Sequence, residues 1–87
     1  MDKEKMVKDA ISLAKKHGVI FSDTTPSFRP KKDNRKEIVY IQINFSGGQI
    51  SKDFRFSELD QFDEIKLANF FIELVNEKDN QKLKKIE

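Results

Sequence analysis

The stretch that decides the fold is residues 38–56, which read IVYIQINFSGGQISKDFRF. Apolar residues occupy every second position of its first half: Val39, Ile41, Ile43 and Phe45. This period-two pattern is typical of a strand with one buried face. The pair Gly47-Gly48 follows, and a type I′ turn needs positive φ at both central positions, which favours glycine. Apolar residues then return at Ile50, Phe54 and Phe56, so the stretch predicts a β-hairpin.

A turn at Gly47-Gly48 also sets the expected register. It pairs Phe45 with Ile50 and Val39 with Phe56, which brings the apolar residues of both strands to one face. On the opposite face it makes a cross-strand pair of Tyr40 and Arg55.

One residue does not fit the apolar face of this hairpin. Lys52 falls opposite Ile43 on the predicted core side. We therefore expect either a long side chain that extends its charge to solvent or a β-bulge nearby.

Helical patterns flank the hairpin region. Residues 2–17 carry an apolar stripe at helical spacing, and Gly18 supplies a residue suited to end a helix. A second helix is predicted from about residue 59 to 77, with Ser57 and Asp60 as a capping box. Between the first helix and the hairpin, residues 19–30 contain Pro26 and Pro30, which confine any strand there to a sheet edge.

These elements predict an α+β fold with the order α-β-β-β-α. An antiparallel three-stranded sheet should be covered on one face by the two helices. We expect a single domain over residues 1–77 and a polar, frayed tail over 78–87. The chain contains no Cys, no apolar run long enough to cross a membrane and no signal-like start, which predicts a cytoplasmic protein.

Candidate catalytic and metal-binding residues are few. The single histidine, His17, falls at a helix C-terminus, where a positive charge is favoured without any catalytic role. Asp60, Asp63 and Glu64 share a helical face that could gather around a cation, but acids are also the usual residues of a first helical turn. We therefore predict no catalytic residue, no metal site and no cofactor.

Charge is unevenly distributed along the chain. Residues 57–64 hold four acids and no base. Residues 29–36 hold one acid, Asp33, and five basic residues: Arg29, Lys31, Lys32, Arg35 and Lys36. Basic residues on a loop can track phosphates, and the nearby Tyr40 and Arg55 can stack on a base or anchor a protein interface.

The element order, the first-helix ending Leu13-Ala14-Lys15-Lys16-His17-Gly18 and the Gly-Gly hairpin resemble the double-stranded-RNA-binding domain over about residues 8–75. The resemblance implies RNA contacts through the first helix, the loop between the first two strands and a basic cluster opening the second helix. Here that loop has basic residues but lacks a Gly-Pro-x-His motif. The second helix opens with Asp63-Glu64-Ile65-Lys66 in place of lysine pairs.

The sequence therefore predicts a small non-enzymatic binding module, a protein–protein adaptor or inhibitor. The acidic helix start would allow it to imitate nucleic acid. The partner-binding residues on this hypothesis are Tyr40, Arg55, Asp60, Asp63 and Glu64. The alternative is an RNA- or DNA-binding domain that uses the basic residues of segment 29–36.

Overall fold

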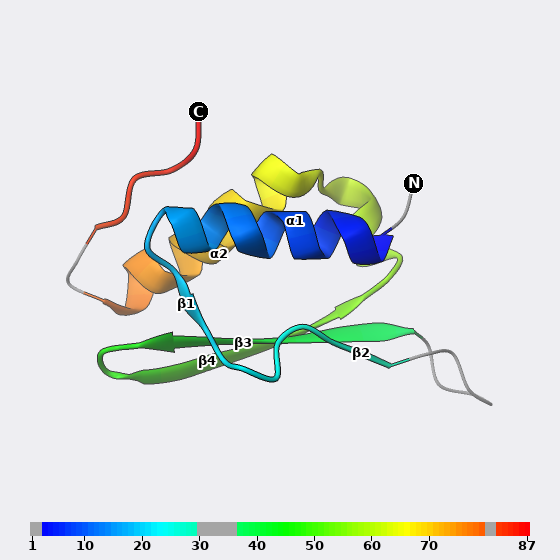
Figure 1. Cartoon of the computed structure of the whole chain (residues 1–87), viewed down its shortest axis with the longest axis horizontal. Coiled ribbons are helices and arrows are strands. Elements are labelled where there is room, and N and C mark those ends of the chain that lie inside the picture. Colours follow the sequence, from blue (N-terminus) through cyan, green and yellow to red (C-terminus); the bar gives the residue numbers. More distant parts are fainter. Residues whose placement is uncertain (1–2, 30–36, 80–81) are drawn as a thin grey trace.

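The computed structural model describes residues 3–29, 37–79 and 82–87. The element order is α1 (Lys3–Lys16), β1 (Ile20–Phe21), β2 (Ser27–Arg29), β3 (Ile38–Phe45), β4 (Gly48–Arg55), the 3₁₀ helix η1 (Glu58–Gln61) and α2 (Glu64–Lys78). Both α-helices lie on the same face of the antiparallel sheet (Figure 1). The predicted α+β class and the placement of the helices are confirmed.

The sheet has four strands rather than the three predicted. β3 is central: β4 pairs with one of its edges, while β1 and β2 both pair with the other. The extended segment predicted around Pro26 is thus split in two. In the gap, Gln42 of β3 donates its backbone N–H to the Thr25 hydroxyl over 2.8 Å. The side chain of Thr25 thereby replaces the strand partner that β3 lacks at this point.

The β3–β4 hairpin is displaced by two residues from the predicted register. Its turn is Ser46-Gly47, so Phe45 lies opposite Gly48 and Val39 lies opposite Phe54. The predicted type I′ turn at Gly47-Gly48 is wrong, because only Gly48 of the two has positive φ, at 148°. A shift of two residues keeps every side chain on its predicted face, since strand side chains alternate with a period of two.

The second helix begins later than predicted. Residues 58–61 form η1, Phe62 is extended, and α2 starts at Glu64 with Asp63 as its N-cap. The Asp63 carboxylate accepts a hydrogen bond of 2.8 Å from the Lys66 backbone N–H, whereas Ser57 makes no side-chain cap. The capping box predicted at Ser57 is therefore wrong. The break before α2 allows Leu59 and Phe62 both to reach the core.

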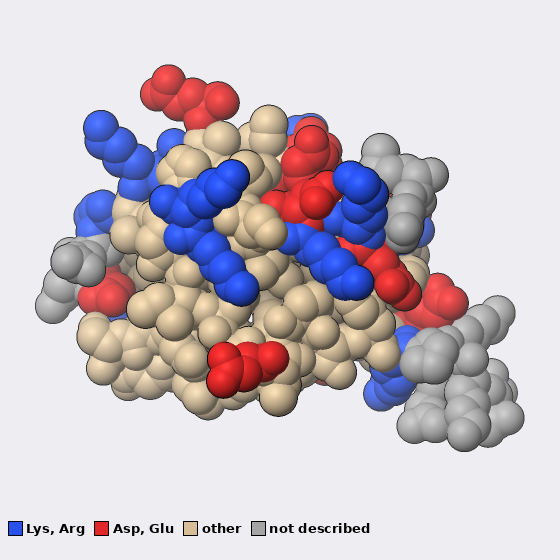
Figure 2. All heavy atoms as spheres, in the orientation of Figure 1, with Lys and Arg blue, Asp and Glu red and all other residues tan. Residues whose placement is uncertain are grey.

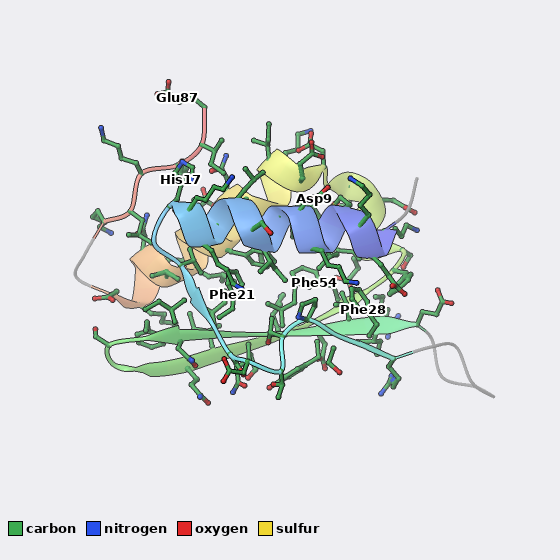
Figure 3. The ribbon with its side chains drawn as sticks, viewed as in Figure 1. Asp9, His17, Phe21, Phe28, Phe54 and Glu87 are labelled. Carbon is green, nitrogen blue, oxygen red and sulfur yellow. The ribbon has the colours of Figure 1, made fainter. Side chains whose placement is uncertain are left out.

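Aromatic residues fill the space between the sheet and the helices. Phe71 of α2 is fully buried, and its ring lies edge-on to Phe21 at 5.5 Å and to Phe54 at 6.3 Å between centroids. Figure 3 shows Phe21 and Phe54 in this layer. Lys52 points from the same face of β4, with its Nζ 5.9 Å from the rings of Phe54 and Phe70. Its exposed side chain thus covers the aromatic cluster while its charge remains in solvent.

The end of α1 follows the predicted glycine pattern. Gly18 has φ 105°, and the Val19 backbone N–H returns to the Ala14 carbonyl over 3.0 Å. Val19 is buried, so the chain turns into β1 with an apolar contact beneath the turn.

The sequence predicted a frayed tail over residues 78–87. In the structure Lys78 ends α2, and residues 82–87 lie along that helix. The side chains of Asn69 and Asn76 hydrogen-bond to the backbone of Ile86 and Leu83. In Figure 1 this segment lies on the helical side of the molecule, away from the sheet. Neither helix in the described ranges has the length and apolar character that would let it cross a membrane.

Candidate functional site

The face of the sheet opposite the helices is the main candidate binding surface. Strand alternation places Val39 and Ile41 in the core and their neighbours on this opposite side. We call it the open face, formed by Ser27, Arg29, Ile38, Tyr40, Gln42, Gln49, Ser51, Asp53 and Arg55. Within the described ranges, no helix packs against it (Figure 1).

Two arginines lie on the open face on either side of an apolar residue. Ile38 of β3 is paired with Arg29 of β2 on one side and with Arg55 of β4 on the other. Both arginines are exposed, and Ile38 is half-buried. Since neighbouring strands lie about 4.8 Å apart, the two arginine backbones are roughly 10 Å apart. This row brings together Arg29, which the sequence assigned to nucleic-acid binding, and Arg55, which it assigned to a protein partner.

Tyr40 occupies the next row of the open face. It lies between Ser27 and Asp53, and its hydroxyl is 3.0 Å from the Ser51 Oγ. The predicted cross-strand pair of Tyr40 and Arg55 is therefore wrong, because the register is displaced by two residues. Arg55 still shares the face with Tyr40, at the diagonal position beyond Asp53.

The acidic residues predicted as partner contacts lie elsewhere. Asp60 belongs to η1, and Asp63 and Glu64 lie at the start of α2, on the helical side of the sheet (Figure 1). Asp60 forms an ion pair of 2.7 Å with Lys3 of α1, and Asp63 caps α2. The structure thus separates these acids from the open face. Two of the three already have partners within the chain.

The predicted basic segment is only partly described. Arg29 ends β2 and is exposed. Lys31, Lys32, Arg35 and Lys36 lie outside the described residues. On the helical side, lysine, arginine and acidic side chains are interspersed in the view of Figure 2.

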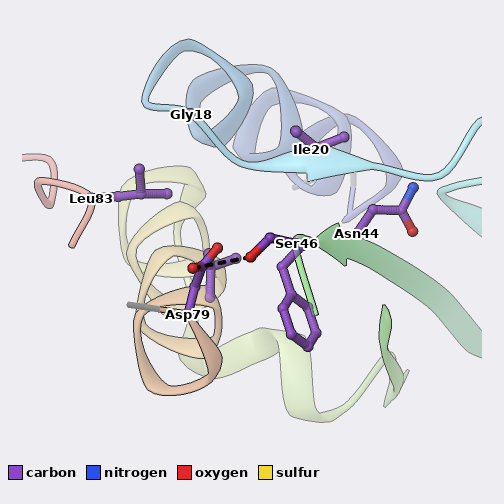
Figure 4. Close-up of a pocket in the computed structure, with 8 residues that line it drawn as sticks. Gly18, Ile20, Asn44, Ser46, Asp79 and Leu83 are labelled. Atoms are coloured by element: carbon purple, nitrogen blue, oxygen red, sulfur yellow. Dashed lines mark hydrogen bonds between the residues drawn. The ribbon is translucent and has the colours of Figure 1, made fainter. Parts of the chain in front are cut away.

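A small pocket opens where β1, the end of β3 and the end of α2 meet (Figure 4). Its volume is about 330 Å³, and its walls include Ile20, Asn44, Val75 and Leu83. Ile20 is 63% exposed although it is a large apolar residue. The Asn44 Oδ1 is buried without a hydrogen-bond partner among the described residues. The pocket therefore combines apolar walls with one unsatisfied acceptor.

His17 and the acidic residues were the remaining candidates for chemistry. His17 directly follows α1, and its Nδ1 is 3.0 Å from the carbonyl oxygen of Leu13 in the last turn of that helix. Over the described ranges, no group of three His, Cys, Asp or Glu residues is arranged to hold a metal ion.

Sequence reasoning missed the residues that bind segment 82–87. Asn69 and Asn76 are seven positions apart, a spacing that places two side chains on one helix face, and this spacing was a usable signal. Leu83 and Ile86 were passed over as part of a polar tail, although they are its only large apolar residues.

Comparison of the chain with models of known protein families, with curated protein sequences and with solved structures gave no match. The resemblance to the double-stranded-RNA-binding domain therefore stays a prediction based on element order and spacing.

Proposed function

We propose that this protein is a non-enzymatic binding module that engages a protein partner through the open face. The observation that carries the proposal is the row formed by Arg29, Ile38 and Arg55, with Tyr40 beside it. Tyrosine and arginine, together with tryptophan, are enriched among the residues that supply most of the binding energy at protein interfaces. An apolar residue between two guanidinium groups suits a partner that presents an apolar side chain flanked by carboxylates.

Mimicry of nucleic acid is not part of this proposal. Such mimicry needs acids that face outward toward a basic groove. The Asp60 carboxylate is engaged by Lys3, and that of Asp63 by the backbone of α2. Both acids therefore have structural roles that account for their positions.

Site-specific crosslinking tests the proposal. A photoreactive residue, p-benzoylphenylalanine, would replace Tyr40, and as a control it would replace Glu77, which is exposed on α2. We expect a protein adduct from position 40 that resists nuclease treatment, is absent from position 77 and disappears when Arg29 and Arg55 are changed to Gln. An adduct of the same kind from both positions, or one that is destroyed by nuclease, would contradict the proposal.

Nucleic-acid binding is the second candidate, because Arg29, the first residue of the basic segment, shares the open face with Tyr40 and Arg55. An aromatic ring beside guanidinium groups can stack on exposed bases. On this alternative, changing Lys31, Lys32, Arg35 and Lys36 to Gln would weaken RNA or DNA binding. The slope of log affinity against log salt would fall by about one unit or slightly less per lysine or arginine lost. Gel shifts with duplex and single-stranded probes at two salt concentrations measure both quantities.

A further inference from the structure

Two asparagines on α2 hold residues 82–87 by their backbone. The Asn76 side chain donates to the Leu83 carbonyl oxygen over 3.0 Å and accepts from the Leu83 N–H over 2.8 Å. Asn69 makes the same pair of bonds to Ile86, at 2.9 Å and 2.7 Å. Each amide thus satisfies both backbone groups of one residue, as a neighbouring strand would.

The spacing of the two asparagines matches the repeat of an extended chain. Seven residues make about two turns of helix, so both side chains lie on one face and are about 10.5 Å apart along the axis. Three residues of extended or polyproline-like chain span about 9–10 Å. A helix with asparagines at this spacing can therefore bind every third residue of an extended peptide.

Side-chain contacts add selectivity to these backbone bonds. Leu83 and Ile86 are half-buried against the core, and Leu83 lies over Gly18, where an added Cβ would come within 2.9 Å of its Cδ2. Lys85 forms an ion pair with Glu73, which is on the same helix stripe as the asparagines. We call this surface, formed by Gly18, Asn69, Glu73 and Asn76, the asparagine groove.

We propose that the asparagine groove is a docking site for an extended segment of a protein partner, which residues 82–87 occupy in cis. The segment should carry two aliphatic residues three positions apart, with a lysine before the second, as Leu83, Lys85 and Ile86 do. The four backbone bonds can be made by any extended peptide, so exchange with an external segment needs no new chemistry in the groove. This proposal does not depend on the open face or on the partner proposed there.

Because residues 82–87 already occupy the asparagine groove, an external peptide must compete with them for it. A tethered segment acts at a high effective concentration, and an external peptide binds only the fraction of molecules in which the groove is open. Release of the segment should therefore increase the apparent affinity for an external peptide without changing the groove itself.

Fluorescence anisotropy with a labelled, end-capped peptide KLKKIE tests this competition in the full chain. The variant with Leu83→Ser and Ile86→Ser should release the segment and bind the peptide at least about tenfold more tightly than the parent chain, a difference of about 1.4 kcal/mol. Adding Asn69→Leu and Asn76→Leu should remove this binding. The matched control Glu77→Gln, made in the released variant, should bind as that variant does.

A peptide of identical composition but altered spacing, KLKIKE, completes the design. We expect it to bind the released variant at least about tenfold more weakly than KLKKIE, because its aliphatic residues are two positions apart. Equal binding of the two peptides, or binding of neither, would overturn the proposal. So would unchanged affinity after both asparagines are replaced. Circular dichroism of each variant would establish that α2 is intact.

Two measurements on the parent chain do not depend on any variant. The backbone amides of Leu83 and Ile86 should exchange with solvent more slowly than that of Lys84. Equally fast exchange of the three amides would show that residues 82–87 do not occupy the asparagine groove. Sedimentation should give a monomer at all concentrations, whereas dimerisation would assign the groove to segment 82–87 of a second copy and overturn the proposal.

Discussion

Replacing Asp63 with alanine tests where the second helix begins. Its carboxylate accepts the Lys66 N–H at 2.8 Å, and loss of such an N-cap costs about 1 kcal/mol. The negative charge at the helix N-terminus adds about 0.3–1 kcal/mol, so we expect Asp63→Ala to lower the free energy of unfolding by about 1–2 kcal/mol. Domains are stable by about 0.05–0.15 kcal/mol per residue, which makes this a large fraction of the total for 87 residues.

Urea unfolding followed by far-UV circular dichroism would measure the loss. The midpoint should fall with an unchanged slope, because the surface exposed on unfolding stays the same. The melting temperature should drop by about 4–8 °C for each kcal/mol. Asp63→Asn keeps an acceptor but removes the charge, so it should cost only about 0.3–1 kcal/mol.

Ser57 provides the matched control, because the sequence pattern placed the cap there. Its side chain makes no capping hydrogen bond and is exposed, so Ser57→Ala should change the stability by less than about 0.5 kcal/mol. The reasoning is refuted if Ser57→Ala destabilises the fold by 1 kcal/mol or more, on the order of a lost cap, while Asp63→Ala does not.

Three further predictions address the core, the turn and the register. Phe71→Ala should lower the free energy of unfolding by about 3–5 kcal/mol, because the ring is fully buried, and a denaturation curve like that of the parent would contradict its placement. Gly48→Val should destabilise the hairpin by about 1–2 kcal/mol in the same assay, since φ at Gly48 is 148°, a conformation that β-branched residues avoid, and no loss of stability would refute that backbone geometry. In this cysteine-free chain, Tyr40→Cys with Asp53→Cys should form a disulfide on mild oxidation, whereas Tyr40→Cys with Arg55→Cys should not, and mass spectrometry showing the reverse would restore the predicted register.

The two proposed surfaces lie in different layers of the molecule. The open face belongs to the sheet, while the asparagine groove lies on α2, on the other side of the core. A partner on one surface therefore leaves the other accessible. An adaptor that joins two proteins requires this arrangement, and crosslinking at position 40 in the presence of excess KLKKIE peptide would test whether both surfaces are used together.

Much of the fold could be predicted because alternation and helical spacing are local properties. The alternation around Ile41 and Ile43 assigned each side chain to the correct face of β3, and Gly18 marked the end of α1. The register could not be predicted in the same way. Displacement by two residues leaves every side chain on the same face, so the apolar pattern fits both registers, and the choice depends on the backbone at Gly48.

The candidate site was predicted only in part, for a related reason. Tyr40 and Arg55 were correctly assigned to one face, but their neighbours depend on which strand lies beside which. Arg29 joins them because β2 pairs with β3 at Ile38, a contact between residues nine positions apart in the sequence. Asp60 and Asp63 were expected to share the face of one helix, but Asp60 lies in η1 and Asp63 caps α2. Their partners, Lys3 and the backbone of α2, are visible only in the folded chain.

The sequence by itself determined the α+β class, the buried faces of the two helices and of the hairpin, and the absence of cysteine, because these depend on residue type and local period. The tertiary structure alone decided the position of residues 82–87. In the sequence they look like a charged tail with two isolated apolar residues. Asn69 and Asn76 fix the segment because two helical turns and three extended residues have nearly the same length. This match in length matters only in the folded chain, where segment 82–87 turns back and lies beside α2.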